Sequence, residues 1–149
     1  MNSMNQARTI GELRKAGYQI RPVKEEVRSN LIKKLESGAT LFPGIIGYEK
    51  SVIPAIVNAL LARHDLLLLG LRGQAKSRIV RQLPTLLDEF IPAVKGCEIN
   101  DNPFKPVCKR CADLVRESGE DVEIEWLSRE FRFSEKLATP DVTIADLIG

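Results

Sequence analysis

Four consecutive leucines at residues 66–69 lead directly into the glycine-rich segment GLRGQAKS, residues 70–77. A short, unbroken apolar run that ends at a glycine is typical of a strand buried on both faces, as in a parallel sheet. Apolar residues recur at helical spacing on both sides, in residues 53–61 and 79–87. This order of helix, strand, glycine loop and helix predicts the start of an α/β domain, with a parallel sheet flanked by helices.

The segment 70–77 differs at one position from the phosphate-loop pattern G-x-x-x-x-G-K-[ST], because Ala75 replaces a glycine. In such a loop the backbone amides surround the phosphates, the lysine reaches the β- and γ-phosphates, and the hydroxyl binds Mg²⁺. The candidate ATP-binding residues are Gly70, Arg72, Gly73, Gln74, Ala75, Lys76 and Ser77, with Ser77 as the Mg²⁺ ligand. If position 75 needs a left-handed backbone, alanine costs about 1–2 kcal/mol there. The alternative is a helix-capping glycine turn with an incidental lysine.

The rest of the chain divides into a helical extension, residues 1–40, and the α/β portion, residues 41–149. An amphipathic helix is predicted within residues 21–38, and Ser51 can cap the next one. Pro84 should kink or split the helix that follows residue 77. Alternating residues at 122–133 predict a strand, and a final short helix is expected with Thr139 as its cap and Pro140 at its first position.

Three cysteines lie in an insertion at about residues 96–120, in the pattern C-x₁₀-C-x₂-C formed by Cys97, Cys108 and Cys111. A C-x₂-C pair can supply two ligands of a tetrahedral Zn²⁺ site, and an odd number of cysteines cannot form a closed set of disulfides. The fourth ligand stays open between Asp101, Glu98, the distant His64 and water. Buried or loop thiols without a metal, and a redox pair, are the alternatives to structural Zn²⁺.

A family resemblance extends over nearly the whole chain. The stretch FPGIIGYEKSVIPAIVNALLARHDLLLLGLRGQAKSRIVRQL, together with GCEIND and SEKLATPDVTIADLIG, resembles the AAA+ ATPase subunit of magnesium chelatase and its shorter bacterial relatives. The resemblance implies a partial P-loop NTPase domain in which Ile45, Ile46 and Gly47 lie against the adenine of ATP. It also implies a homo-oligomeric ring that drives a partner with an integrin-like (von Willebrand A) metal-binding domain. Leu71 departs from the family, where a glutamate is usual.

The groups that would hydrolyse ATP are missing from this sequence. Hydrolysis needs a second carboxylate-bearing strand and usually an arginine from a neighbouring copy. The segment LLDEF has the hydrophobic-Asp-Glu order of that acidic strand at Asp88 and Glu89, but it falls within a helical pattern. By the resemblance, the chain stops before the acidic strand and the arginine finger. We therefore expect weak nucleotide binding without turnover by this chain alone.

Composition restricts the other classes of function. The chain has 149 residues, 44% of them hydrophobic and 28% charged, a typical balance for a folded domain. There is no secretion signal, no membrane-length apolar run, and no basic run interleaved with aromatic residues. We expect a cytoplasmic protein that binds neither membranes nor nucleic acids. The alternative function is a non-enzymatic, zinc-stapled interaction module with a degenerate phosphate loop.

Overall fold

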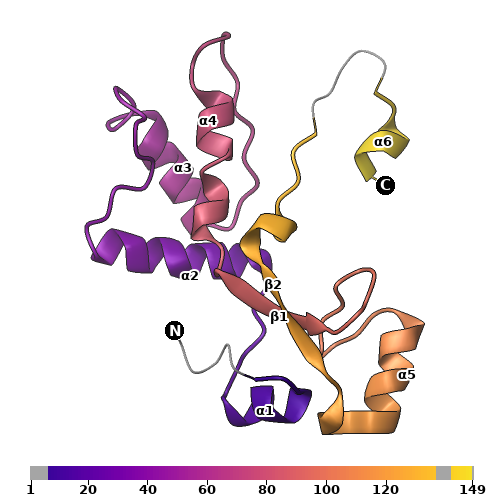
Figure 1. The fold of residues 1–149 in the computed structure, drawn as a ribbon. Helices are drawn as coiled ribbons and strands as arrows, with labels where there is room; N and C mark the ends of the chain where they lie inside the picture. Colours follow the sequence, from indigo (N-terminus) through magenta and orange to yellow (C-terminus); the bar gives the residue numbers. More distant parts are fainter. Residues whose placement is uncertain (1–6, 137–141, 149) are drawn as a thin grey trace.

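The computed structural model describes residues 7–136 and 142–148. It contains the α-helices α1 (Ile10–Lys15), α2 (Val23–Glu36), α3 (Val52–Leu61), α4 (Lys76–Val80), α5 (Lys109–Ser118) and α6 (Ile144–Ile148). Two strands, β1 (Phe90–Val94) and β2 (Ile124–Ser128), and three short 3₁₀ helices, η2 (Leu83–Leu86), η3 (Gly119–Asp121) and η4 (Arg129–Arg132), complete the described elements. Figure 1 shows α2, α3 and α4 together on one side of the two strands, with α1 and α5 on the other.

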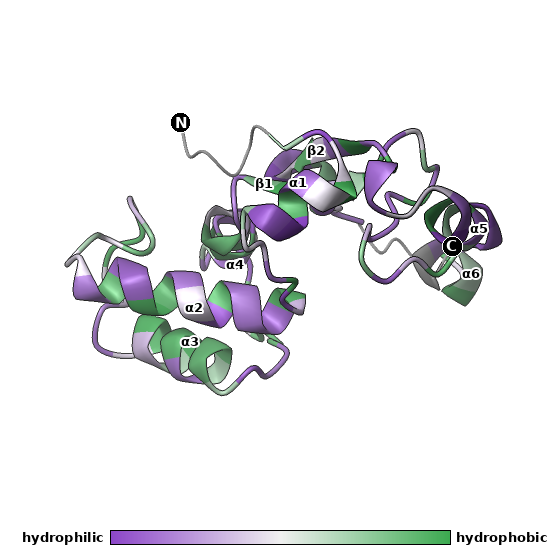
Figure 2. Ribbon diagram, turned by 90° about the horizontal axis from the view of Figure 1, so that it is seen from below, coloured by the Kyte–Doolittle hydropathy of each residue, from purple (hydrophilic) through white to green (hydrophobic). Residues whose placement is uncertain are grey.

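The predicted helices at residues 21–38 and 53–61 are confirmed as α2 and α3. In Figure 2, α3 is apolar over most of its surface and lies beside the more polar α2. Ser51 is the N-cap residue of α3, although its side chain makes no capping hydrogen bond. The helix after residue 77 is split as expected, because α4 ends at Val80 and Pro84 lies in η2. The predicted caps Thr139 and Pro140 lie outside the described residues.

The sheet consists of β1 and β2, which pair antiparallel from Phe90 opposite Ser128 to Val94 opposite Ile124. The predicted strand at residues 122–133 is thus confirmed over Ile124–Ser128, after which the chain turns into η4. The sequence predicted no strand for β1, which contains Pro92. Proline has no amide donor and is tolerated only where a strand has a free edge, a condition that a two-stranded sheet provides.

The predicted partial P-loop NTPase domain, with a parallel sheet flanked by helices, is wrong, because the described residues contain only this two-stranded antiparallel sheet. Residues 66–69 are not a strand, and no backbone hydrogen bond joins residues 65–69 to another described segment. Leu66 and Leu68 pack against the apolar core, whereas Leu67 and Leu69 are 81% and 83% exposed. The alternation shows an extended segment covered on one face only. A leucine run can set that conformation, but a sheet needs partner strands for its backbone groups.

The apolar core has two separate clusters of buried residues. The first joins the N-terminal region, β1, β2 and α5, and consists of Ala7, Ile10, Leu13, Val94, Cys97, Cys111, Val122 and Ile124. The second lies around α3 and α4 and consists of Phe42, Ile45, Ile56 and Ile79. We refer to them as the cysteine-side cluster and the loop-side cluster. Each of the two candidate sites therefore has its own apolar support.

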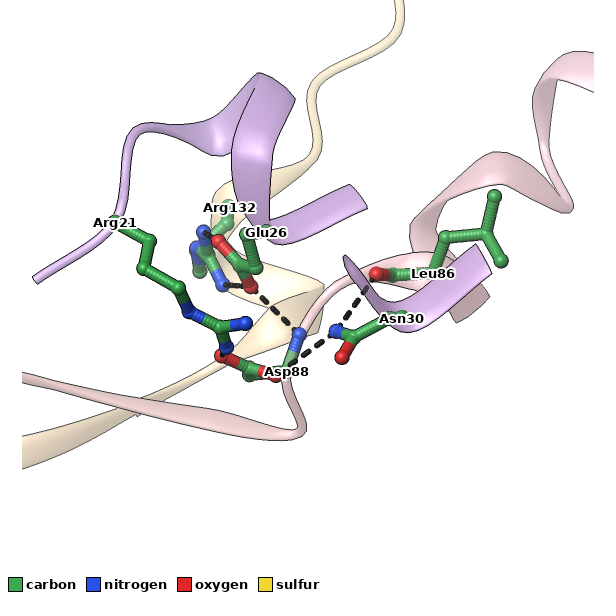
Figure 3. A network of polar contacts seen from close by, with 6 residues as sticks. All are labelled: Arg21, Glu26, Asn30, Leu86, Asp88 and Arg132. Carbon is green, nitrogen blue, oxygen red and sulfur yellow. Dashed lines mark hydrogen bonds and ion pairs between the residues drawn. The ribbon is translucent and has the colours of Figure 1, made fainter. Parts of the chain in front are cut away.

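A buried polar network fastens α2 to the segment before β1 and to η4 (Figure 3). Glu26 is 3% exposed, and its carboxylate accepts two hydrogen bonds from the guanidinium of Arg132, at 2.7 and 2.6 Å. It also accepts the backbone amide of Asp88 at 2.6 Å. The Asp88 side chain in turn accepts bonds from Arg21 at 2.6 Å and Asn30 at 2.8 Å. The sequence analysis placed Asp88 within a helical pattern, which is wrong, because Asp88 lies between η2 and β1, where its side chain is bound in this network.

No helix within residues 7–136 and 142–148 has both the length and the apolar character that crossing a bilayer requires.

Candidate metal centre and phosphate loop

The three cysteines come together at the end of the cysteine-side cluster, and Asp101 joins them. One donor atom from each of Cys97, Asp101, Cys108 and Cys111 lies within 4.8 Å of all the others. Cys97 follows β1, whereas Cys108 and Cys111 lie at the start of α5. Since thiolate and carboxylate groups in tetrahedral reach are ligands of Zn²⁺, this group could hold a metal ion.

A backbone hydrogen bond to one of the sulfur atoms helps to fix the positions of the cysteines. Cys108 is the N-cap residue of α5, and its Sγ accepts the amide of Cys111 at 3.3 Å. The Sγ atoms of Cys97 and Cys108 are 4.0 Å apart, and none of the three cysteines forms a disulfide. The cap role places one sulfur at the beginning of a helix, and the one-turn spacing brings the second sulfur of the C-x₂-C pair to the same side.

The thiols of Cys97 and Cys111 differ in their acidity. Burial opposes ionisation of Cys97, but hydrogen bonds from the amides of Asp101 and Ile99 outweigh it and lower the pKa of this thiol. Burial, followed by hydrogen bonds with Cys108 and Cys97, raises the pKa of the Cys111 thiol to about 12. A metal ion that needs both sulfurs as thiolates must therefore displace a tightly held proton from Cys111.

Asp101 has a role that the sequence analysis did not recognise. Its carboxylate is 4% exposed and accepts backbone amides from Asn102, Val107 and Cys108. Burial works against ionisation, but the amides of Cys108 and Val107 together with the Cys108 thiol lower the pKa of Asp101. The Asp-Asn-Pro sequence at residues 101–103, a combination common in turns, was the available signal for this loop.

The other two protein ligands that the sequence left open do not join the centre. Among the described residues, the group with metal-ligand reach includes neither Glu98 nor His64. Glu98 is exposed, and His64 lies beside α3 on the wall of a separate cavity.

The glycine loop at residues 70–77 folds back on itself around the side chain of Lys76. The Lys76 ammonium donates to the carbonyl oxygens of Gly70 and Leu71, at 2.8 and 2.5 Å. Three loop residues have a positive φ: Gly70 (152°), Gly73 (81°) and Ala75 (55°). A β-carbon at Gly70 would lie 2.2 Å from Oε1 of Gln74, a contact that the flexible Gln74 side chain can relieve by moving. The preference for glycine at this position therefore comes from its backbone conformation.

The backbone amides of this loop have no partner within the described residues. None of the amides at residues 71–78 donates a hydrogen bond to a described residue, although Ala75 and Ser77 offer their carbonyl oxygens to α4 and the turn after it. Arg72 and Ser77 are exposed. Consecutive unpaired amides in a turn are the groups that bind an anion.

The three residues expected to contact adenine lie near the loop but in different environments. Ile45 is 6% exposed and belongs to the loop-side cluster, so its place is in the core. Ile46 is 87% exposed, and Gly47 has a φ of 86°. Tyr48, which the sequence analysis did not single out, ties this segment to the loop by a hydrogen bond of 3.4 Å to the carbonyl of Gln74.

A cavity of about 630 Å³ lies behind the loop. Its wall is mainly apolar, from α2, α3, α4 and the leucine run, and Lys76 and Ser77 line it with the charged groups of Arg63 and Asp65. The cysteine centre has no residue in this cavity, so the structure holds two independent candidate sites.

No family model, no curated protein and no solved structure matches this sequence.

Proposed function

We propose that this chain binds ATP with Mg²⁺ through residues 70–77, as the nucleotide-binding portion of a motor ATPase similar to the AAA+ subunit of magnesium chelatase. The observation that carries the proposal is the arrangement of the loop. The Lys76 ammonium is bound by two loop carbonyls, and the amides of residues 71–78 have no described partner. A cation beside a row of unpaired amides suits a polyphosphate.

Each element of the proposed site has a defined role. Lys76 would exchange its two carbonyl partners for the β- and γ-phosphates, and the exposed hydroxyl of Ser77 would bind Mg²⁺. The exposed side chain of Ile46 would cover the adenine. In an assembled motor, copies of the chain would form a ring and act on a partner with an integrin-like metal-binding domain. We propose binding without turnover for this chain alone, since the Asp88 carboxylate is already bound by Arg21 and Asn30.

Thermal unfolding with and without MgATP tests the proposal, because a ligand that binds only the folded state raises the midpoint in proportion to RT ln(1 + [L]/Kd). Lys76→Ala should weaken ATP binding about tenfold to a hundredfold, which corresponds to the roughly 1.5–3 kcal/mol of a hydrogen bond to a charged group. Lys33→Ala, an exposed lysine of α2, is the matched control and should bind as the unaltered chain does. If MgATP raised the unfolding midpoint equally in the K76A and K33A variants, the proposal would be overturned.

A second candidate function, a zinc-stapled interaction module, is supported by the cysteine centre. We propose Zn²⁺ as its ion, because thiolate-rich sites favour Zn²⁺ over the hard cations Mg²⁺ and Ca²⁺. The group links the end of β1 to the start of α5, and Cys97 and Cys111 are both part of the cysteine-side cluster. Zinc there would fix the loop at residues 97–108 on the core.

Zinc content after dialysis, measured by elemental analysis, tests this candidate. We expect one Zn²⁺ for each chain and loss of the metal in Cys111→Ser. Glu98→Gln is the matched control, because Glu98 is a neighbouring carboxylate outside the donor group. Full zinc retention in C111S, or no zinc in the unaltered chain, would exclude the module.

A further inference from the structure

The cysteine centre offers four donor residues, and the structure distinguishes one of them from the other three. The question is whether Asp101 is a ligand of the metal or a support for the ligands. With Asp101 as a ligand the centre is closed, as structural zinc sites are. Without it, the metal retains a position for an outside ligand. The inference below rests on the proposed binding of Zn²⁺.

The carboxylate of Asp101 already has its acceptor positions occupied. Oδ1 accepts the amides of Asn102 and Val107, both at 3.0 Å. Oδ2 accepts the amides of Val107 and Cys108, both at 2.8 Å. An ionised carboxylate has about four lone-pair positions, and here they are taken by four contacts from three amides, with a further hydrogen bond to the Cys108 thiol. Coordination by Asp101 would compete with these hydrogen bonds, and only the Val107 amide, which contacts both oxygens, could keep a contact with the carboxylate at either one.

The same four contacts explain how the cysteines are held in reach of each other. Asp101 binds the two amides that immediately precede α5, at Val107 and Cys108, and the amide that follows it in the loop. Its own backbone carbonyl accepts the amide of Val94 in β1, at 2.9 Å. Asp101 is thus a positioning residue: its backbone joins β1, and its side chain holds the start of α5 and so the C-x₂-C pair.

The three sulfur atoms, in contrast, have free capacity for a metal. Cys97 and Cys111 are 7% and 1% exposed, and Cys108 is half-buried. The protein contacts of Cys108 Sγ are the Cys111 amide at 3.3 Å, the Cys97 sulfur at 4.0 Å and a hydrogen bond to Asp101. Amide bonds to a sulfur are compatible with its coordination, because a metal–thiolate sulfur still accepts hydrogen bonds. Cys108 is the most accessible of the three and marks the side from which solvent reaches the centre.

We propose that Cys97, Cys108 and Cys111 bind Zn²⁺ as three thiolates, and that the fourth position faces solvent and accepts a neutral nitrogen donor from outside the chain. Three thiolates and one Zn²⁺ carry a net charge of −1, and the Asp101 carboxylate adds a second negative charge beside them. A further anionic ligand would increase this repulsion in a partly buried site. Water therefore occupies the fourth position of the free protein, and an imidazole nitrogen can replace it without added charge.

Substitution with Co²⁺ makes the donor set visible, because its absorption bands report the number of thiolate ligands and the geometry. We expect the bands of a four-coordinate, three-thiolate site in the unaltered chain. Added imidazole should shift the visible bands in a saturable titration, and azide, an anionic donor, should shift them only at much higher concentration. A spectrum that imidazole leaves unchanged would overturn the proposal.

The variant Asp101→Asn separates a ligand from a positioning residue. If Asp101 is a positioning residue, the Co²⁺ bands of D101N should keep their positions. Its affinity for Co²⁺ should be roughly tenfold to a hundredfold lower, as is typical when a residue that supports a metal ligand is changed. Shifted bands in D101N would identify Asp101 as the fourth ligand and overturn the proposal. The imidazole titration needs only the unaltered chain, so it decides the question even if D101N does not fold. Absence of any Co²⁺ or Zn²⁺ binding would instead reject the zinc candidate itself.

Discussion

Ala75 is a residue whose backbone conformation is costly for its side chain. Its φ of 55° and ψ of 14° lie in the left-handed region, where the β-carbon approaches the following carbonyl. Alanine in this conformation costs about 1–2 kcal/mol relative to glycine. This left-handed backbone explains why the phosphate-loop pattern has glycine at this position.

Ala75→Gly should therefore stabilise the folded chain. Relief of about 1–2 kcal/mol, less about 0.4–1 kcal/mol for the larger conformational freedom of glycine in the unfolded chain, leaves a gain of at most about 1.6 kcal/mol, with about 0.8 kcal/mol as the middle of the range. Urea unfolding measures it as a higher midpoint at an unchanged slope. Ala55→Gly in α3 is the control and should lose about 1 kcal/mol, because glycine is unfavourable inside a helix. A lower midpoint for A75G would contradict the assignment.

Asp101 makes the stability of the metal-free chain depend on pH. Its pKa is lower in the folded chain than the usual value, so its ionised form stabilises the fold above the unfolded-state pKa of about 3.9. This contribution is lost as the pH falls through the lower, folded-state pKa. The unfolding free energy should thus exceed that of D101N by a constant amount above about pH 5, and the difference should shrink below about pH 4. Urea unfolding with a chelator and a reductant measures both proteins; a difference independent of pH would contradict the role of these amide bonds.

At the scale of elements, the contact between α2 and η4 depends on one buried ion pair. Arg132 and Glu26 have side chains that are 9% and 4% exposed, and the bond to Glu26 raises the pKa of Arg132. Removal of one partner of a buried pair leaves the other charge without compensation. The pair therefore contributes less to stability than the loss on breaking it suggests.

Glu26→Ala should lower the unfolding free energy by about 3–5 kcal/mol, since it leaves the Arg132 guanidinium buried and unpaired. The double variant Glu26→Leu with Arg132→Met should lose clearly less, because both charges are absent. Glu25→Ala, the neighbouring carboxylate of α2, is the control: its pairs with Arg28 and Arg63 are partly exposed and contribute about 0–1 kcal/mol. Urea unfolding of the three variants measures the effects, and equal losses in E26A and the double variant would refute an uncompensated charge as the cause.

The helices were largely predictable from the sequence, whereas the sheet was not. The hydrogen bonds of a helix are local, so apolar spacing predicted α2 and α3, and Pro84 predicted the end of the helical run after residue 77. A strand depends on a distant partner. Residues 66–69 have strand composition but no partner strand among the described residues, whereas β1 contains Pro92 and is a strand because β2 lies beside it.

The same distinction applies to the candidate metal centre. The spacing of Cys97, Cys108 and Cys111 was sufficient to predict the donors, because a C-x₂-C pair places two sulfurs together locally. The role of Asp101 was not predictable, since it depends on how the loop at residues 97–108 returns to the end of β1. Sequence spacing identifies candidate ligands, but tertiary contacts decide which neighbouring residues hold them in place.

At the scale of the whole molecule, the two candidate sites belong to different apolar clusters. Cys97 and Cys111 are members of the cysteine-side cluster, whereas Ala75 packs against the loop-side cluster. The buried network around Glu26 lies between them, where α2 meets the segment leading into β1. A ligand at either site should therefore stabilise mainly the half of the molecule that supports it.

Hydrogen exchange of the backbone amides can separate the two halves. Zn²⁺ should slow exchange in α1, β1, β2 and α5, whose side chains build the cysteine-side cluster, and should leave α3 nearly unchanged. MgATP should have the opposite effect, with protection of residues 71–78, whose amides have no described partner, and of α3. Cys111→Ser should abolish the effect of Zn²⁺ and retain that of MgATP, and Lys76→Ala should do the reverse. Equal protection of both clusters by either ligand would show that the chain unfolds as one cooperative unit, and the assignment of each site to its own cluster would then be wrong.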